Sequence, residues 1–318
     1  MDKHAKIFVA GHRGLVGSAF MRYFEGKGYS NVVTRTRSEL DLFDQRVVLD
    51  FFRQERPEYV IFSAGRVGGI VENKAYPADF ITQNLEMQLN VFKAARECEV
   101  NRLVYFGSSC MYPRECPQPM NEDQLLTGRP EQTSIAYAIA KLAGVQMSLS
   151  YNEQHGRRRF IPVIPNSVFG PNDNFNPASG HVLSALINRF HAAKKQDVDE
   201  VTLWGSGLPR REFLYSDDLV SACLLLLGTN LDELQMPLNI GPGDDVSIKE
   251  LAETIARIIG YQGDIKWDTS KPDGTPRKLL DSSRMKALGW TPATALEDGI
   301  RRTYEWYLEQ AQAIEKND

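Results

Sequence analysis

The chain has 318 residues, of which 42% are apolar and 25% are charged, a balance typical of globular proteins. This length exceeds one minimal core and suits a larger domain with a smaller second one. The formal charge of −4, with no cluster of lysine and arginine, argues against a nucleic-acid partner.

The N-terminal stretch and the cysteines predict a cytoplasmic protein without a membrane span. MDKHAKIFVAG leads into an apolar run too short for a signal peptide, and no run approaches the roughly 18 apolar residues of a membrane helix. Cys98, Cys110, Cys116 and Cys223 lack the spacing of a metal site, so no metal is expected. Cys110 and Cys116 could bridge a loop, but we expect free thiols in the cytoplasm.

Short apolar runs alternate with helical patterns as far as about residue 170. Strands are predicted at 6–10, 32–34, 59–63, 102–107 and 160–165, and helices at 15–27, 47–54, 79–98 and 136–155. This alternation predicts an α/β fold with a Rossmann-type, doubly wound parallel sheet covered by helices on both faces.

The pattern changes after Gly170. A polar loop at 171–180 precedes a predicted helix at 181–194, a hairpin-like stretch around 204–207, and helices at 217–227 and 247–259. Ser247 and Glu250 form a capping-box pattern at the start of the last helix. Without a low-complexity linker, we expect interleaved domains: residues 1–170, with 215–242 returning to them, and a smaller α/β domain mainly within 171–318.

Three glycines follow the first strand and open the first helix. Gly11 suits a tight turn, Gly14 lets the backbone approach a pyrophosphate, and Gly17 lets the helix pack on the sheet. The helix N-terminus then faces the phosphates. This turn predicts a dinucleotide site formed by Gly11, His12, Arg13, Gly14, Leu15, Val16 and Gly17. The GxxGxxG spacing is that of the short-chain dehydrogenase/reductase superfamily.

The end of the second strand indicates the choice of cofactor. An acidic residue there would bind the ribose of NAD. This chain instead has Thr-Arg-Thr-Arg at 34–37, and a 2′-phosphate favours guanidinium partners. Arg37, helped by Arg13, therefore predicts NADP. Asp41 and Leu42 stand where this superfamily contacts the adenine.

A second set of residues predicts carbonyl chemistry. Tyr137 and Lys141 are four residues apart, so they share one helix face. We expect the Lys141 ammonium to bring the pKa of the Tyr137 phenol towards neutral pH. Ser108 follows the fourth strand, where its hydroxyl can bind a substrate carbonyl. Tyrosine, lysine and serine in this order behind a glycine turn form a specific pattern.

Cys110 lies two residues beyond the serine, and His181 opens the helix after the polar loop. Sugar dehydratases of the superfamily usually carry Asp-Glu near the first position, which disfavours dehydration. A thiol there suits removal of a proton next to a carbonyl, with His181 as its partner. Taken one at a time, a packed cysteine and a histidine at a helix start would be the better explanations of these residues.

Longer runs carry a family resemblance over residues 7 to about 290. The runs GHRGLVGSA, RTRSELDL, GSSCMYP, YAIAK, FGPNDNFNPASGHV, WGSGLPRREFL and KPDGTPRKLLD resemble the GDP-L-fucose synthases, which are GDP-4-keto-6-deoxy-D-mannose 3,5-epimerase/4-reductases. The resemblance implies an NADP-dependent enzyme that epimerises C3 and C5 and then reduces C4 of a GDP-linked keto-sugar.

The resemblance also implies roles for individual residues. Cys110 and His181 would exchange the protons at C3 and C5, and Ser108, Tyr137 and Lys141 would serve the carbonyl. Further cofactor contacts are implied for Phe106, Gly107, Ser108, Tyr137, Lys141, Pro165, Asn166, Ser167, Val168 and His181. GDP-sugar contacts are implied for Arg189, Trp204, Arg211 and Asp273. By analogy, a homodimer through helices 79–98 and 136–155 is expected.

Two other functions remain open. Departures at 63–65 and Ser216 leave room for another GDP-4-keto-sugar, such as a heptose or colitose precursor. A non-catalytic NADP-binding regulator is also possible on this fold, although it would have no need of the serine, tyrosine and lysine.

Overall fold

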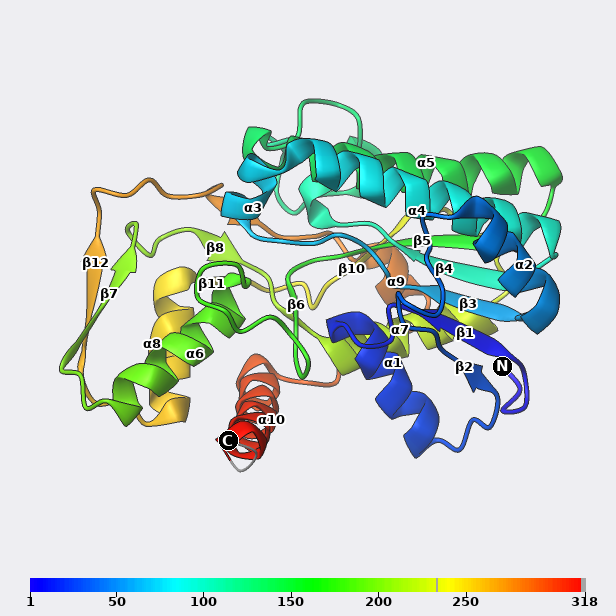
Figure 1. Ribbon diagram of the computed structural model, residues 1–318. Helices are drawn as coiled ribbons and strands as arrows, with labels where there is room; N and C mark the ends of the chain where they lie inside the picture. Colours follow the sequence, from blue (N-terminus) through cyan, green and yellow to red (C-terminus); the bar gives the residue numbers. More distant parts are fainter. Residues whose placement is uncertain (233, 316–318) are drawn as a thin grey trace.

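A parallel sheet organises the larger part of the molecule. In the computed structural model, which describes residues 1–232 and 234–315, this sheet has six strands in the order β10–β5–β4–β3–β1–β2 (Figure 1). Its strands are β1 (Ile7–Ala10), β2 (Val32–Val33), β3 (Tyr59–Phe62), β4 (Arg102–Phe106), β5 (Phe160–Pro165) and β10 (Leu238–Ile240). Every neighbouring pair is parallel, so the carboxyl ends of the strands meet at one edge.

Helices cover both faces of this sheet (Figure 1). One face carries α2 (Gln45–Glu55), α4 (Pro77–Glu97) and α5 (Ile135–His155), and the other carries α1 (Leu15–Gly26), α7 (Ser216–Gly228) and α9 (Ser283–Ala287). Successive strand residues alternate between the two cores: Phe8 packs on one side, and Ile7 and Val9 pack on the other. Burial on both faces explains why the strands read as continuous apolar runs.

The second part of the molecule has its own apolar core. Helices α6 (Val182–Lys195), α8 (Ile248–Ile259) and α10 (Leu296–Glu315) contribute to it, together with β7 (Glu200–Trp204). Strand β7 pairs with β12 (Asp264–Asp268). A small sheet places β8 (Arg210–Arg211) between β11 (Val246–Ser247) and β13 (Arg277–Lys278). The pair β6 (Val168–Phe169) and β9 (Leu214–Tyr215) connects the two parts.

Short elements complete the edge where the strands end. These are α3 (Ile70–Ala75) and the 3-10 turns η1 (Ser109–Met111), η2 (Glu122–Gln124) and η3 (Gln132–Ser134). The segment after β9 forms α7, which packs on the six-stranded sheet, and β10, which pairs with β5 in it. The chain therefore returns from the second part of the molecule to the first.

The predicted α/β fold is confirmed, and the predicted capping box of Ser247 and Glu250 is present. One expectation is wrong: no hairpin forms around 204–207. Strand β7 ends at Trp204 and pairs in parallel with β12, a partner from much later in the chain. Gly205 and Gly207 have positive φ values of 82° and 76°, so the stretch does turn, but into a loop and not into an adjacent antiparallel strand.

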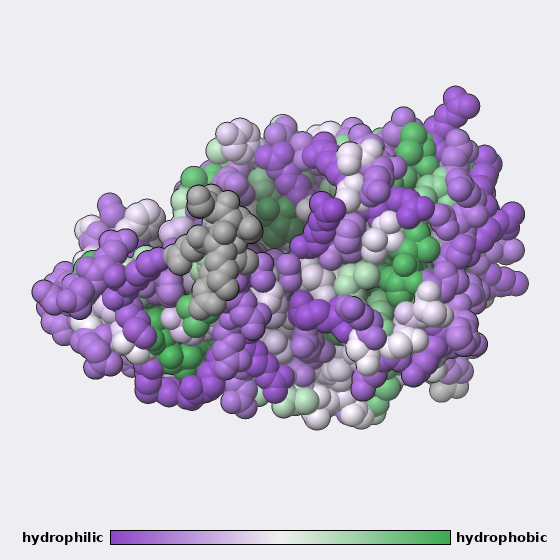
Figure 2. All heavy atoms as spheres, turned by 60° about the horizontal axis from the view of Figure 1, so that its bottom comes forward, coloured by the Kyte–Doolittle hydropathy of each residue, from purple (hydrophilic) through white to green (hydrophobic). Residues whose placement is uncertain are grey.

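The four cysteines are free thiols, as expected. Cys223 is fully buried in α7 as a small apolar side chain. None of the helices in the described ranges is long and apolar enough to cross a membrane. Figure 2 shows one face that is mostly hydrophilic, with small separate hydrophobic areas.

Candidate active site

The glycine turn between β1 and α1 forms a shallow backbone cradle. Gly11 has a φ of 83°, and a Cβ there would lie 2.7 Å from the backbone nitrogen of Ala64. A Cβ on Gly17 would lie 2.2 Å from the carbonyl oxygen of Gly11. The fold therefore requires glycine at both positions. At Gly14 the nearest atom to an added Cβ is 3.6 Å away, so the protein itself does not require glycine there.

This difference fits a ligand that approaches Gly14. Gly14 precedes α1 and makes no side-chain cap, so the first N–H groups of the helix remain available to an anion. His12 Nδ1 is buried without a hydrogen-bond partner in the described residues, and burial lowers the pKa of His12. Val16 packs against the core and serves the fold. The cradle and the unpartnered nitrogen fit the diphosphate end of a dinucleotide.

The two arginines after β2 have different surroundings. Arg35 forms an ion pair with Glu55 at 2.7 Å and lies 5.4 Å from the centre of the Phe51 ring. The Arg37 guanidinium lies over Phe43 at 5.0 Å, and within residues 1–232 and 234–315 no carboxylate pairs with it. Arg37 is therefore the arginine whose charge is free to meet a 2′-phosphate.

A buried asparagine holds the predicted adenine loop. Asn90 on α4 donates from Nδ2 to the carbonyl oxygens of Leu42 and Phe43, both at 3.0 Å. Asp41 accepts a hydrogen bond from the Phe43 backbone nitrogen at 3.1 Å. Sequence reasoning missed Asn90, because nothing in its local pattern indicates a contact with a loop nearly fifty residues earlier.

Ser108, Tyr137 and Lys141 come together at the end of β4. Ser108 follows Gly107, and its hydroxyl interacts with the phenol of Tyr137. Lys141 Nζ donates to the carbonyl oxygen of Phe106 at 2.9 Å and lies 5.9 Å from the centre of the Tyr137 ring. The structure thus holds the lysine beside the tyrosine by a backbone contact that the YxxxK spacing alone does not reveal.

The pKa values of this group differ from the sequence-based expectation. Burial, followed by the nearby Cys110, raises the pKa of Tyr137 above its usual range, and only the hydrogen bond with Ser108 lowers it. Burial also lowers the pKa of Lys141 to about 8. The expectation that Lys141 brings the pKa of the phenol towards neutral pH is therefore wrong here, because burial of Tyr137 raises that pKa. A protonated phenol suits a proton donor.

Cys110 lies in the same group and faces two cations. Its backbone nitrogen donates to Ser108 Oγ at 3.3 Å, which fixes the first turn after β4. Its sulfur lies 3.8 Å from Lys278 Nζ, and it interacts electrostatically with Arg211 and Tyr137. The thiol is half-buried, so this cysteine is not a residue packed in the core.

His181 is the N-cap residue of α6 and is exposed. It interacts electrostatically with the carboxylate of Asp173. Burial raises the pKa of Asp173 overall, although a hydrogen bond from Ser184 acts in the opposite direction. Within the described residues no direct contact joins His181 to Cys110: Cys110 follows β4 in the larger part of the molecule, and His181 precedes α6 in the second part.

The loop after β3 links these two parts. A Cβ on Gly65 would lie 3.5 Å from Lys141 Nζ, and a Cβ on Gly69 would lie 3.3 Å from the carbonyl oxygen of Ser179, two residues before His181. The Cα atoms of Gly65 and Gly69 can be at most about 15 Å apart. The lysine and the segment before His181 therefore lie against the two ends of one five-residue stretch.

The chain after β5 forms a further wall. Pro165 ends β5, Val168 begins β6, and Ser167 between them has a φ of 28°. Asn166 is completely buried, so its side chain faces the protein, where it donates to Glu212 Oε2 at 3.0 Å. Asn166 therefore holds this segment to the protein interior.

Glu212 is a buried carboxylate that sequence reasoning missed. It has no exposed surface, and burial raises its pKa. Besides Asn166, its carboxylate accepts hydrogen bonds from the backbone nitrogens of Leu280 at 2.9 Å and Gly243 at 2.8 Å. Three segments far apart in the sequence thus meet on one side chain. No local motif marks such a junction.

Two of the predicted substrate residues lie side by side. Trp204 is 70% exposed, and Lys271 Nζ lies 5.9 Å from its ring centre. Asp273 lies at the next residue, because a Cβ on Gly205 would be 2.4 Å from Asp273 Oδ1. The exposed face of Trp204 is suited to stacking with a base, and the carboxylate of Asp273 beside it is suited to accepting hydrogen bonds from the N–H groups of that base.

The two predicted arginines differ. Arg211 is half-buried, with Nη1 bonded to the Arg210 carbonyl oxygen at 2.7 Å, and a Cβ on Gly274 would lie 3.2 Å from its Nη2. Arg211 therefore connects the Asp273 loop with Cys110. Arg189 on α6 is exposed, and among the described residues no side-chain contact joins it to the other three.

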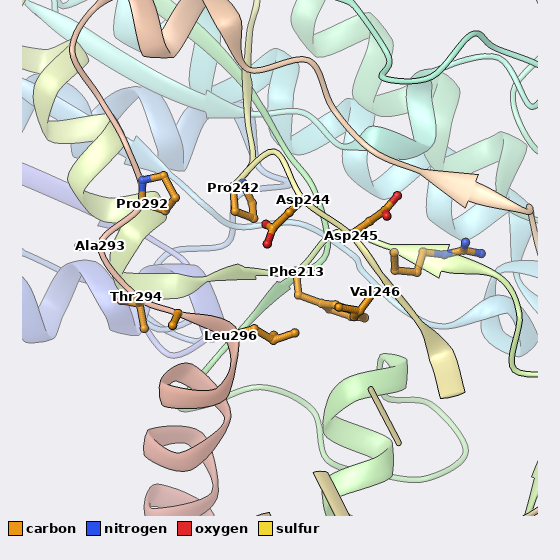
Figure 3. Close-up of a pocket in the computed structure, with 11 residues that line it drawn as sticks. Phe213, Pro242, Asp244, Asp245, Val246, Pro292, Ala293, Thr294 and Leu296 are labelled. Carbon is orange, nitrogen blue, oxygen red and sulfur yellow. The ribbon is translucent and has the colours of Figure 1, made fainter. Parts of the chain in front are cut away.

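A separate pocket of about 300 Å³ lies between the loop at 242–246 and the segment that leads into α10 (Figure 3). Phe213 and Leu296 line it, with Asp244 and Pro292 around them. It includes Arg211 but none of the predicted catalytic side chains, so it is not the catalytic cleft. Within the described residues, no group of histidine, cysteine and acidic side chains could hold a metal ion.

Comparisons with known proteins place the sequence in a family. The profile of the NAD dependent epimerase/dehydratase family matches residues 7–241. A putative GDP-L-fucose synthase 2 of Arabidopsis thaliana is 52% identical over 97% of this chain and 93% of its own length. The GDP-L-fucose synthase of Escherichia coli K12 is 48% identical over 96% and 97%. The chain belongs to the GDP-L-fucose synthases of the NAD dependent epimerase/dehydratase family.

More distant relatives include two whose names give other sugars, and two solved structures with NADP bound. A GDP-L-colitose synthase of Yersinia pseudotuberculosis is 33% identical over 96% of this chain and 98% of its own. The solved structure of a GDP-mannoheptose C4 reductase from Campylobacter jejuni with NADP bound is 37% identical, with a TM-score of 0.89 over 97% of this chain and 99% of that one. A GDP-L-fucose synthetase from Naegleria fowleri bound to NADP is 29% identical, with a TM-score of 0.88 over 98% and 96%.

Proposed function

We propose that this protein converts GDP-4-keto-6-deoxy-D-mannose into GDP-L-fucose by epimerising C3 and C5 and then reducing C4 with NADPH. The observation that carries this proposal is the thiol of Cys110 beside Tyr137 and Ser108, which puts a proton-exchanging group next to a carbonyl-binding pair. The relatives at 48–52% identity are named as GDP-L-fucose synthases, whereas the colitose and heptose relatives are at 33% and 37%.

One carbonyl serves both reactions. Ser108 and Tyr137 hold the C4 oxygen through their hydroxyl groups, so that negative charge on this oxygen is stabilised in each step. C3 and C5 both neighbour C4, and loss of a proton from either carbon gives an enolate on the same oxygen. Cys110 and His181, on the two sides of the cleft, remove and return these protons.

The reduction uses the same oxygen. NADPH, when bound, supplies the hydride for C4. Tyr137 gives its proton to the oxygen, and the raised pKa of Tyr137 keeps that proton on the phenol until it is needed. The contact with the Phe106 carbonyl oxygen fixes Lys141, so that its positive charge lies beside the Tyr137 ring.

Other parts of the molecule support the binding of both ligands. The glycine turn, Arg37 and the wall at 165–168 suit NADPH, and Arg189, Trp204, Arg211 and Asp273 suit GDP and its sugar. Residues 1–170 with 215–242 form the cofactor domain, and the rest of 171–318 forms the substrate domain.

Leu89 and Ile139, 42% and 40% exposed on α4 and α5, support a homodimer through these helices, which a measurement of the molecular mass in solution tests. The free thiols support a cytoplasmic location, which cell fractionation tests.

Product analysis tests the function. The protein is incubated with NADPH and GDP-4-keto-6-deoxy-D-mannose, and in parallel with GDP-4-keto-heptose and the colitose precursor. We expect rapid NADPH oxidation and GDP-L-fucose only in the first reaction. Preferential turnover of another keto-sugar would assign that sugar instead, and no turnover of any would favour the non-catalytic regulator.

Arg37→Met is expected to raise KM for NADPH by about 10- to 100-fold, because charge-assisted hydrogen bonds contribute about 1.5–3 kcal/mol. KM for NADH should not change, since NADH lacks the 2′-phosphate. Steady-state kinetics with both cofactors provide the measurement. Arg46→Met, which removes an exposed arginine on α2, is the matched control. An equal loss with both cofactors would refute the assignment.

The rate of NADPH oxidation is expected to fall as pH rises through about 8, the pKa that burial gives Lys141. Above this pH Lys141 is neutral, so its positive charge no longer stabilises Tyr137 when the phenol gives up its proton. Loss of folding does not explain such a fall. The pKa of Lys141 is lower in the folded than in the unfolded chain, so its contribution to stability increases from pH about 8 to about 10.5. A pH–kcat profile checks this, and a flat profile would contradict it.

A further inference from the structure

Lys278 places a cation in contact with the candidate acid–base thiol. Its Nζ lies 3.8 Å from Cys110 Sγ, although the two residues are 168 positions apart in the chain. Both side chains are half-buried. Within residues 1–232 and 234–315, no carboxylate forms an ion pair with Lys278, so its charge is available to the sulfur.

The backbone of Lys278 is fixed by the buried network around Glu212. The Lys278 carbonyl oxygen accepts from Asn166 Nδ2 at 3.1 Å and from the Glu212 backbone nitrogen at 3.3 Å. The Glu212 carboxylate in turn binds the backbone nitrogen of Leu280. The lysine therefore extends towards Cys110 from a rigid point, which lowers the entropy cost of keeping its ammonium there.

A second cation approaches the thiol from the same small sheet. Strand β13 pairs with β8, and Lys278 stands opposite Arg211. Arg211 also interacts electrostatically with Cys110. Arg211, however, has its guanidinium bonded to the Arg210 carbonyl oxygen and adjacent to Gly274 in the predicted substrate loop. Lys278 is thus the cation whose side chain contacts the sulfur directly.

We propose that Lys278 is a positioning residue for Cys110, whose ammonium orients the sulfur and stabilises it while it is an anion. If Cys110 removes the proton from C3 or C5, the thiolate becomes a thiol and the C–H electron pair moves into the enolate. If Cys110 returns the proton, the enolate pair forms the C–H bond and the sulfur is left as a thiolate. The sulfur is anionic at one end of the transfer in either direction, so the role holds for both assignments.

The test measures the nucleophilicity of the thiol directly. Full-length protein is treated with iodoacetamide at neutral pH, and alkylation of each cysteine is followed by peptide mass spectrometry. Only the thiolate reacts. Lys278→Met is expected to slow alkylation of Cys110 by about tenfold or more. Cys116, half-buried and bonded to Gln124, is the internal reference and should react unchanged.

Three further variants complete the design. Lys266→Met removes an exposed lysine of β12 and should leave both alkylation and activity unchanged. Lys278→Arg keeps the charge and should restore part of the rate. Lys278→Gln replaces the methionine variant if that protein does not fold, as judged by circular dichroism.

A second readout joins the proposal to the reaction. Because that readout rests on the proposed function, solvent deuterium exchange at C3 and C5 is measured alongside alkylation, and it should fall by a similar factor with little change in KM for the GDP-sugar. A raised KM with unchanged alkylation of Cys110 would overturn the proposal and assign Lys278 to the diphosphate. A changed alkylation rate in a protein that turns over no keto-sugar would retain the positioning role and refute the proposed function.

Discussion

Tyr137→Phe is expected to lower kcat for NADPH oxidation by about 10²- to 10⁴-fold, the usual contribution of a positioned acid or base. The phenol is the proton donor for the C4 oxygen, and its pKa is raised by burial, so it enters the reaction protonated. Phenylalanine keeps the ring and its edge contact with Phe80 at 6.3 Å but removes the hydroxyl. KM for NADPH should change little, because the glycine turn and Arg37 remain. Stopped-flow NADPH oxidation provides the measurement.

Tyr304→Phe is the matched control for this variant. It removes a hydroxyl on α10 that lies 3.1 Å from His191, in the core of the second part of the molecule. We expect kcat to be unaffected by this change. If Tyr137→Phe reduced the keto-sugar at the rate of the unchanged protein, Tyr137 could not be the proton donor.

Cys110→Ser is expected to reduce solvent deuterium uptake at C3 and C5 by about 10²- to 10⁴-fold. The hydroxyl occupies nearly the same space as the thiol but gives up its proton far less readily. Binding of NADPH should be unchanged, because Cys110 lies outside the glycine turn. Proton NMR of the keto-sugar in D₂O without NADPH follows exchange alone, since no hydride is then available for reduction.

Cys116→Ser gives the matched comparison, because this half-buried thiol bonds to Gln124 and not to the carbonyl-binding pair. Exchange should proceed normally in it. Exchange at the normal rate in Cys110→Ser would remove the thiol from the mechanism and leave His181 to act with another group.

The elements of the larger domain were predictable because each has a local signal. Strands buried on both faces read as apolar runs, and Gly11 and Gly17 stand where an added Cβ would collide with backbone. The hairpin around 204–207 was predicted wrongly for the opposite reason. The partner of β7 is β12, and pairing between distant parallel strands leaves no mark on the local pattern.

The candidate site was predictable to the extent that its residues belong to motifs. Ser108, Cys110, Tyr137 and Lys141 lie in two short runs, and the structure brings these runs together. Its electrostatics were not predictable. The spacing of Tyr137 and Lys141 indicates proximity, but the direction in which the phenol pKa moves depends on burial by residues from many segments.

The supporting residues were missed for the same physical reason. Glu212 joins Asn166, Gly243 and Leu280, and Lys278 meets Cys110, through contacts between residues far apart in the chain. A glutamate or lysine in a polar run reads as a surface residue until the fold buries it. Three-dimensional proximity is therefore the information that the structure adds.

The central claim is that one carbonyl group serves both epimerisation and reduction, and isotope placement in the product tests it most directly. The unchanged protein is incubated with GDP-4-keto-6-deoxy-D-mannose and unlabelled NADPH in D₂O, and the product is analysed by NMR. The account predicts GDP-L-fucose with deuterium at C3 and C5 and hydrogen at C4, because the first two positions exchange with solvent and the third receives hydride. A reduced product with hydrogen at C3 and C5 would contradict it.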